Sequence, residues 1–485
     1  MTRSNVSWSR TVLWRRRRAS FPLAFAGLVG LSVLVAPQGL AAEPEGPALI
    51  DDPTLGALVL EALDHRPEVS QARALIAAEG ERVPQAGAFP DPSLTFGIQN
   101  DSFTKIQIGQ METSWVTLMV TQNVPWYGKR GLRTDVASLA VRQSEADLER
   151  VRLSLRAEVE RAYIDLLLVR DQLVLLSKLE ALWLFSEGLA RTRYEAGEGA
   201  QSDLLRAQLE RTRLSQRRWA LAAEQRRRIA VLNRLRSQPL GEAILTNRSL
   251  ADIPDPPPDV AVEEAEKRSP ELQKARLSLE QAGKRLQLAG KDYFPDPAFS
   301  AGVMPRGKLE PMWQVGVSFG IPVWAASKQS RAVSENELRK RAAGDGAEVL
   351  RQLLHLRLRE RSVVLEALVQ TNRLYRSGLL VLSESTVTST LAQYQVGRVP
   401  FASVLEALAG YLTDVNGFLE SAAATQRLAT AQRELSLDPL SSLPAGGMGS
   451  SVPAAGGMGA GAASSAPGSS TLQRVETGAS AAPGM

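Results

Sequence analysis

The 485-residue sequence contains no cysteine, and it has only two histidines and few aromatic residues. The lack of cysteine excludes disulfide bonds, thiolate metal ligands and thiol nucleophiles, and we expect no lipid anchored on an N-terminal cysteine. His65 and His355 lie far apart in the chain, so we expect no metal site and no cofactor. Aromatic residues make up 5% of the chain, while Ala, Leu, Arg, Glu and Gln dominate its middle. This composition is typical of long helices.

Sequence motifs of common enzyme classes are also missing. The chain has no nucleophile elbow and no His-Glu-x-x-His, and the Gly128-Lys129 pair lacks the upstream glycine loop of a phosphate site. The paired carboxylates lie among arginines, as on the solvated face of a helix. We therefore predict that the protein is not an enzyme.

A targeting segment accounts for the basic charge of the chain. Residues 1–42 contain six arginines and no acidic residue, with an apolar stretch over 21–35 and small residues at Ala41 and Ala42. This pattern predicts a cleaved signal peptide and export; the alternative, an uncleaved anchor, is disfavoured because the stretch is short. Cleavage leaves 51 basic against 52 acidic residues, so the formal charge changes from +5 to −1. Nucleic-acid binding then has no electrostatic support.

The rest of the chain contains one arrangement twice. Phe89-Pro90-Asp91-Pro92 precedes a first strand pair, and Phe294-Pro295-Asp296-Pro297 precedes a second pair 205 residues later. This spacing indicates a duplication at half-chain scale, longer than solenoid repeats. We expect four segments after the signal peptide: a first repeat over 43–246, a Pro-rich linker over 247–259, a second repeat over 260–440 and a disordered Gly/Ala/Ser/Met tail over 441–485.

Alternation with period two predicts two strands in each repeat, at about 93–99, 114–123, 298–304 and 312–320. One face of each strand is apolar, whereas the other is small and polar. A soluble sandwich would also alternate, but only four strands are present and export makes an outer membrane available. Because a membrane barrel needs apolar side chains outside and a closed edge, we expect these residues to face lipid: Leu94, Phe96, Ile98, Val116, Leu118, Val120, Phe299, Val303, Val315, Val317 and Phe319.

Helical patterns fill the remainder of both repeats. Short helices are expected over 53–88 and 260–293, with Pro67 and Pro270 at first helical positions. A helix over about 133–194 carries a heptad stripe that predicts a coiled-coil seam, formed by Leu148, Leu155, Ala162, Val169, Leu176 and Trp183.

Each long helix is expected to turn back as a hairpin, with tips at 194–203 and 394–403. Gly197 and Gly397 suit left-handed C-terminal caps, and Ser202 or Asp203 suits the following N-cap. The return helices run to about 235 and 435. In the second repeat, Gly344-Asp345-Gly346 predicts a kink or an end in the long helix over 328–395.

This arrangement resembles the TolC-like outer-membrane efflux family over nearly all of the mature chain. The resemblance is carried by residues 122–130, by the Tyr-x-x-Gly tips at 194–197 and 394–397, and by the duplicated order. It implies a mainly α fold with a small β part, in which duplicated helical hairpins form an α-barrel. Four strands per chain would contribute to a 12-stranded β-barrel of a homotrimer in a Gram-negative outer membrane, extending into the periplasm.

The resemblance also implies partners and site residues. The tips would dock onto a periplasmic adaptor, which in turn connects to an inner-membrane pump of the resistance-nodulation-division type. The adaptor-docking residues would be Tyr194, Gly197, Tyr394, Gly397, Arg398 and Val399. Asp203 and Glu406 would line the aperture, where carboxylates attract cations; Arg206 and Ser403 stand where further acids would be expected. The stretch 125–130 resembles the heavy-metal branch more than the drug-export branch.

The predicted function is a passive outer-membrane conduit for metal cations or drugs in a tripartite efflux system. Two alternatives stay open from the sequence. The first is the exit duct of a type I protein secretion system, and the second, from a different class, is a soluble periplasmic coiled-coil scaffold. A scaffold would be extracted without detergent and would tolerate charge on its strand faces.

Overall fold

A computed structural model describes residues 52–257 and 261–439 of the chain. The predicted signal peptide (1–42) and the predicted disordered tail (441–485) lie outside the described residues. Among the described residues, no helix combines the length and the apolarity needed to cross a membrane.

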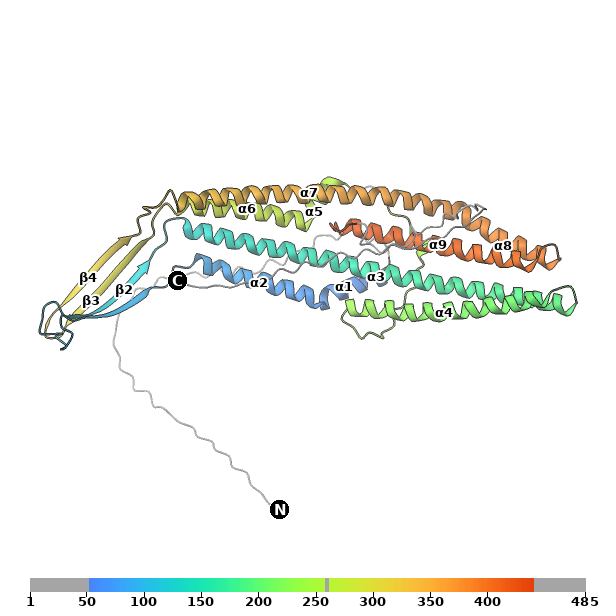
Figure 1. The fold of residues 1–485 in the computed structure, drawn as a ribbon, viewed down its shortest axis with the longest axis horizontal. Helices are drawn as coiled ribbons and strands as arrows, with labels where there is room; N and C mark the ends of the chain where they lie inside the picture. Colours follow the sequence, from blue (N-terminus) through green and yellow to red (C-terminus); the bar gives the residue numbers. More distant parts are fainter. Residues whose placement is uncertain (1–51, 258–260, 440–485) are drawn as a thin grey trace, which may run out of the picture. The chain divides into compact units, whose positions relative to one another are not determined.

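The described part of the first repeat contains four helices and two strands. They are α1 (Pro53–His65), α2 (Pro67–Gly87), β1 (Ser93–Gln99), β2 (Trp115–Asn123), α3 (Lys129–Glu195) and α4 (Gln201–Leu235). A short 3-10 turn, η1 (Leu250–Asp252), follows in the linker. Figure 1 shows the long α3 running alongside α4 over one part of its length and alongside α2 over another.

The second repeat has the same order of elements. They are α5 (Val262–Arg268), α6 (Pro270–Lys291), β3 (Pro297–Arg306), β4 (Leu309–Phe319), α7 (Gln329–Leu374), the π turn η2 (Tyr375–Leu379), α8 (Leu380–Gln395) and α9 (Phe401–Arg433). The expected strands, long helices and hairpins are therefore all present, and the mainly α fold with a small β part is confirmed (Figure 1).

Local sequence explains most helix starts. Asp52 caps α1 by accepting a 2.9 Å hydrogen bond from the N–H of Thr54, and Pro67 and Pro270 occupy the first turns of α2 and α6 as predicted. The N-cap prediction for α4 was wrong, because the helix begins at Gln201 with Ala200 as N-cap and no side-chain cap. The residues at 202 and 203 thus lie inside the first turn.

The long helix of the second repeat breaks at a different place from the one predicted. α7 passes through Gly344 without interruption. The helical hydrogen-bond pattern changes only at the π turn η2, which is five residues long. The cause is tertiary: beside this turn the buried Asn372 donates to Asp255 of the linker at 2.9 Å and to Thr425 of α9 at 3.0 Å. Since the glycine pair has ordinary helical backbone, its small propensity cost is outweighed by packing of α7 against α6.

The four strands form one antiparallel sheet in the order β1-β2-β3-β4. The two hairpins are joined by β2 and β3, so the sheet contains strands of both repeats. Their register places apolar residues opposite one another across the sheet, as in the row Phe96, Leu118, Val303 and Trp313. Within the described residues the outer edges of β1 and β4 have no hydrogen-bonded neighbour.

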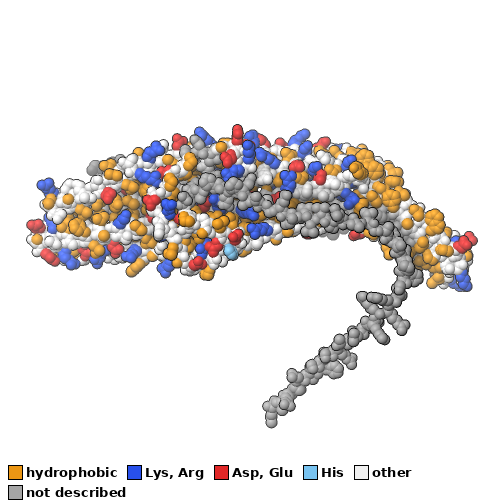
Figure 2. Space-filling view, turned by 180° about the vertical axis from the view of Figure 1, so that it is seen from behind, with side chains coloured by type: hydrophobic (Ala, Val, Ile, Leu, Met, Phe, Trp, Pro, Cys, Tyr) orange, Lys and Arg blue, Asp and Glu red, His pale blue; other side chains and the backbone are white. Residues whose placement is uncertain are grey.

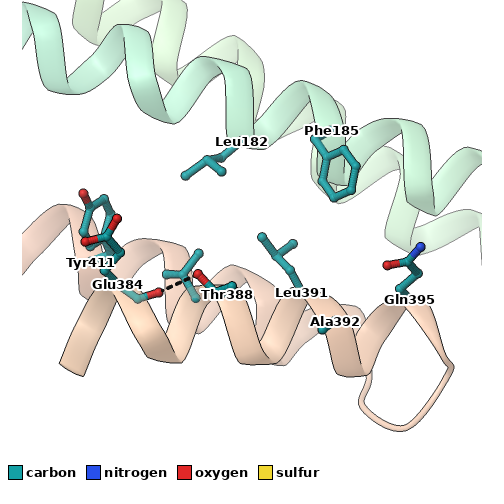
Figure 3. Close-up of a pocket in the computed structure, with 9 residues that line it drawn as sticks. Leu182, Phe185, Glu384, Thr388, Leu391, Ala392, Gln395 and Tyr411 are labelled. Carbon is teal, nitrogen blue, oxygen red and sulfur yellow. Dashed lines mark hydrogen bonds between the residues drawn. The ribbon is translucent and has the colours of Figure 1, made fainter. Parts of the chain in front are cut away.

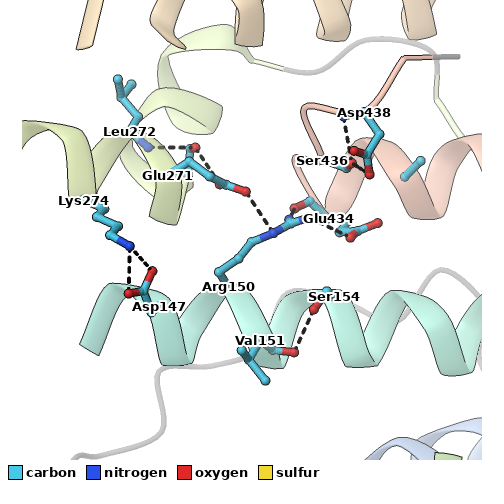
Figure 4. Close-up of polar contacts among 12 residues, drawn as sticks. Asp147, Arg150, Val151, Ser154, Glu271, Leu272, Lys274, Glu434, Ser436 and Asp438 are labelled. Carbon is cyan, nitrogen blue, oxygen red and sulfur yellow. Dashed lines mark hydrogen bonds and ion pairs between the residues drawn. The ribbon is translucent and has the colours of Figure 1, made fainter. Parts of the chain in front are cut away.

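The core lies along α3, which packs against α1, α2, α4, α6 and α9. The predicted heptad stripe is confirmed, since all six of its members are buried. Ion pairs also connect the two repeats. Arg150 of α3 contacts Glu271 of α6 at 2.9 Å and Glu434 after α9 at 3.1 Å. Figure 4 shows this arginine between the two carboxylates.

Candidate functional site

The sheet exposes an apolar face. Phe96, Leu94 and Val315 are each 68% exposed. Most other predicted lipid-facing residues are also exposed, and Val116 and the ring of Trp313 extend the same rows. Figure 2 shows hydrophobic side chains gathered over the strands, whereas charged side chains are spread over the helices. An exposed apolar surface of this extent indicates contact with another apolar phase or partner.

The opposite face of the sheet is small and polar. One row across the strands contains Ser93, Thr121, Ser300 and Gly316, which are cross-strand partners in that order. The geometry therefore separates the two faces as the alternation predicted. Such a sheet can face hydrocarbon on one side and water on the other.

A buried lysine holds the two repeats together where the strands meet the helices. Lys129, the first residue of α3, is 4% exposed, and its ammonium donates to the carbonyl of Phe294 and to Oδ1 of Asp296, both at 2.9 Å. The N–H of Trp126 donates to the same Oδ1 at 2.7 Å, and its ring stacks on Phe294 with centroids 5.5 Å apart. Although partial burial raises the pKa of Asp296, these donors hold it below the ordinary value. We call these four residues the inner clamp.

The motif that carried the family resemblance thus has a structural role. Gly128 has φ +87°, a left-handed conformation that lets the chain turn directly into α3. This turn explains why α3 begins four residues earlier than predicted. Next to the clamp, Arg130 donates to the carbonyl of Gly87 at 2.7 Å and covers the ring of Phe89 at 3.6 Å.

Both hairpin tips end in the same left-handed glycine cap. Gly197 has φ +76° and donates to the carbonyl of Tyr194 at 3.0 Å, and Gly397 has φ +74° and donates to that of Tyr394 at 3.0 Å. The next residue in each tip donates to the carbonyl five positions earlier, which completes a Schellman motif. The predicted capping role of both glycines is confirmed.

Arg193 joins the two tips. Its guanidinium donates to the carbonyl of Tyr394 at 2.8 Å and lies 5.0 Å from the centre of that ring. A Cβ added to Gly397 would lie 3.2 Å from Nη2 of the same arginine. The tips are therefore one joint surface within a single chain.

The predicted tip residues differ in exposure. Tyr394 is 2% exposed and packs against Phe401, with ring centroids 5.3 Å apart, whereas its counterpart Tyr194 is 44% exposed. Arg398 is exposed and Val399 half-buried. A docking partner would thus reach Tyr194 and Arg398 directly.

The two candidate aperture carboxylates lie in different surroundings. Asp203 is half-buried, and Glu406 is exposed on α9. Burial raises the pKa of Tyr394, and the nearby carboxylate of Asp203 raises it further, against the opposing effect of Arg193. Asp203 thus belongs electrostatically to the joined tips, whereas Glu406 points to solvent. Among the described residues, no three His, Asp or Glu side chains gather as a metal site.

A groove of about 350 Å³ lies near the tips between α3 and α8. Figure 3 shows Leu182 and Phe185 of α3 facing Leu391 and Gln395 of α8 across it. Its lining is mostly apolar and carries a single carboxylate, Glu384.

Sequence reasoning missed Arg193, Lys129 and Asp296 as contact residues. Lys129 and Asp296 stood inside motifs that were singled out for their order, but no local pattern says that they touch. Arg193 appeared as one more charged helix residue. The only available signal was its position one residue before the tip tyrosine, where helix C-termini favour cations.

Comparisons with known proteins agree with this architecture. Residues 58–237 match the family described as "Outer membrane efflux protein". A segment of 204 residues is 31% identical to Protein CyaE of Bordetella pertussis (strain Tohama I). This match covers 40% of this chain and 42% of that protein. The chain thus spans about two fifths of the length of this curated relative.

Solved structures share the fold over most of the chain. The outer-membrane channel OprN is similar with a TM-score of 0.65 and 20% identity, over 80% of this chain and 91% of that chain. The outer membrane protein VceC of Vibrio cholerae is similar with a TM-score of 0.65 and 16% identity, over 79% and 95%. The first repeat thus matches the outer membrane efflux protein family, and both repeats share the fold of these solved outer-membrane proteins.

Proposed function

We propose that the protein is a passive outer-membrane channel made of three copies, which conducts substrates delivered from the periplasm to the exterior. The observation that carries this proposal is the sheet, which has one exposed apolar face, one small polar face and, among the described residues, two edges without a paired strand. A single four-stranded sheet cannot close on itself, and a spanning structure in lipid must leave no open edge. Further copies supply the missing neighbours.

In this proposal the apolar rows through Leu118 and Val317 face lipid, and the row through Ser300 faces the lumen. The four strands of each of three copies give a barrel of about 12 strands, within the range of outer-membrane barrels. The helical hairpins continue the duct into the periplasm.

The joined tips form the periplasmic end of the duct. Tyr194, Gly197, Gly397, Arg398 and Val399 make the surface offered to an adaptor, and Tyr394 supports it from below. Asp203 and Glu406 supply carboxylates near the aperture, where rings of three would attract cations. A passive duct has no energy source of its own, so in this proposal an inner-membrane pump provides the energy for transport. Transport of heavy-metal cations and membership in the heavy-metal branch remain predictions.

The experiment begins with purified outer membranes. The native mass of the extracted protein is measured in detergent, and conductance is then recorded in planar bilayers. We expect a mass near three chains, extraction only with detergent, and discrete conductance steps. A monomer or dimer extracted by buffer alone would overturn the channel and favour the periplasmic scaffold.

A deletion strain separates the two transport alternatives. Loss of tolerance to metals or drugs supports efflux, whereas loss of a secreted protein with unchanged tolerance supports the exit duct of a type I secretion system.

A further inference from the structure

The last described residues of the chain lie along α7. The guanidinium of Arg357 donates to the carbonyl of Leu437 at 3.2 Å. One turn further along the helix, the buried Arg361 donates to the carbonyl of Asp438 at 3.1 Å and to that of Ala431 in α9 at 2.9 Å. Two arginines of α7 thus hold consecutive carbonyls of the segment that follows α9, and this segment leaves the described structure on the surface of α7.

A groove with a volume of about 570 Å³ lies on α7 at this point. Its apolar lining is formed by Leu356, Val363 and Val364, and Pro439, the last described residue, lines it too. Leu356 and Val363 are 50% and 51% exposed. They are seven residues apart, so they lie on one side of α7 at a distance of about 10 Å. The chain therefore leaves the described structure at an open apolar groove.

The sequence continues from Pro439 as Leu440-Ser441-Ser442-Leu443-Pro444 and then becomes rich in Gly, Ala and Ser. Consecutive Cα atoms are about 3.8 Å apart, so Leu440 is within reach of the groove by covalent geometry alone. Four residues span at most about 14 Å, which brings both ends of the groove within reach of Leu443. The segment thus offers two large apolar side chains at the place where α7 exposes two.

We propose that this groove is the docking site for the start of the chain's own tail, in which Leu440 and Leu443 pack against Leu356 and Val363. Docking removes these side chains from water, and burial of apolar surface is the main favourable term in folding. The packed part of the second repeat then extends three residues beyond its predicted end at 440. This inference concerns a single chain, so it does not depend on the proposed trimer.

The charges around the groove are compatible with a neutral occupant. Arg357 and Glu360 of the lining pair with each other at 2.7 Å, and Arg359 is exposed to solvent. The segment 440–444 carries no charge. The alternative occupant is an apolar helix face of a second copy. Such a copy has to compete with a segment that is covalently held beside the groove, and a short tether corresponds to an effective concentration in the millimolar range. The tail is therefore the favoured occupant.

A double-mutant cycle on the purified mature protein tests the contact. Leu440→Ala and Val363→Ala should each lower the thermal midpoint by about 2–4 °C, because each removes apolar surface from the same contact. The double variant should lose clearly less than the sum of the two, since changes at residues in contact are not additive. Circular dichroism in detergent measures the midpoints.

Val349 provides the matched control. It is a valine on the same side of α7, 62% exposed and two heptads before Val363, at a distance of about 20 Å. The losses from Val349→Ala and Leu440→Ala should therefore add. If the losses from Val363→Ala and Leu440→Ala also add, or if Leu440→Ala leaves the midpoint unchanged, the tail does not occupy the groove. A loss from Val363→Ala alone would assign the groove to a second copy.

Hydrogen exchange gives a direct readout of the docked segment. The amides of 440–443 should be protected about tenfold more than those of 446–450, as in a locally packed segment. Val363→Asp should abolish this difference, because it places an unpaired charge in the groove. Val349→Asp makes the same change outside the groove and should leave the difference intact. Equal protection of the two segments in the wild type would overturn the proposal.

Discussion

At the scale of single residues, Lys129 is unusual because a lysine is rarely buried, and then only with partners for its charge. Its ammonium is enclosed by a carbonyl and a carboxylate of the other repeat, so its charge is compensated where it lies. The contact joins residues 165 and 167 positions apart. One side chain thereby fixes the position of β3 relative to the start of α3.

We predict that Lys129→Met destabilises the protomer by about 2 kcal/mol, the scale of hydrogen bonds to charged groups. The variant leaves Asp296 and the carbonyl of Phe294 without their cation. Urea unfolding followed by circular dichroism in detergent measures the change. The double variant with Asp296→Asn should lose much less than the sum of the two single losses; additive losses would show that the two side chains do not interact.

At the scale of elements, the proposed channel places one face of each strand against lipid and the other against water. Leu118 lies on central strand β2 between Phe96 and Val303, and its side chain is 44% exposed. Thr117, its neighbour in sequence, points to the polar face and pairs with Gly97.

We predict that Leu118→Arg impairs membrane assembly at a cost of about 2–4 kcal/mol if it lies near the bilayer midplane. Thr117→Arg adds the same charge on the other face and should assemble, with altered ion selectivity. The heat-modified mobility of outer-membrane fractions on gels measures assembly. Equal assembly of the two variants would contradict a lipid-facing apolar row.

The elements themselves could largely be predicted from the sequence because their signals are local. Alternation fixes β1 to β4 within a few residues, and Pro67, Gly197 and Gly397 mark helix ends through backbone geometry alone. The start of α3 and the π turn could not be predicted in this way. The first depends on a left-handed glycine, and the second on contacts of Asn372 with segments more than fifty residues away.

The same difference between local signals and long-range contacts applies to the candidate sites. The apolar and polar faces of the sheet followed from period two, since side chains alternate strictly along a strand. The joined tips did not, because Arg193 meets Tyr394 across 201 residues of chain. The difference in exposure between Tyr194 and Tyr394 comes from the same contact, and no repeat pattern contains it.

At the scale of the whole molecule, the chain has the fold of solved outer-membrane channels. Its polar interior joins distant segments, as at Asp52, which accepts from Thr54 and from the hydroxyl of Tyr163 on α3. Although burial raises the pKa of Asp52, these donors lower it below the ordinary value of 3.8. The same burial and the hydrogen bond to Asp52 raise the pKa of Tyr163.

A depressed carboxyl pKa stabilises the folded state at pH values above the unfolded pKa, and this contribution is lost as pH falls through the folded pKa. We therefore predict that Asp52→Asn lowers the thermal midpoint at pH 7, and that its difference from the wild type shrinks below about pH 4. Asparagine keeps the N-cap hydrogen bond from Thr54, but its amide nitrogen cannot accept from Tyr163, so the substitution removes the charge together with that contact. Midpoints measured between pH 3 and pH 7 test this. A difference that is constant over this range would remove the role of the ionised form.

The free edges of β1 and β4 also have a consequence for the time before assembly. The pairing of β2 with β3 forms within one chain, so its rate does not depend on concentration, whereas pairing between copies requires an encounter. Until that encounter the sheet has no paired strand at either edge in the part of the chain that the structure describes, and Ile321, Val323 and Trp324 are exposed after β4. Such edges recruit strands indiscriminately. If the protein is the proposed exported trimer, newly exported chains should therefore aggregate in proportion to their abundance unless a holding factor shields the sheet until three copies meet.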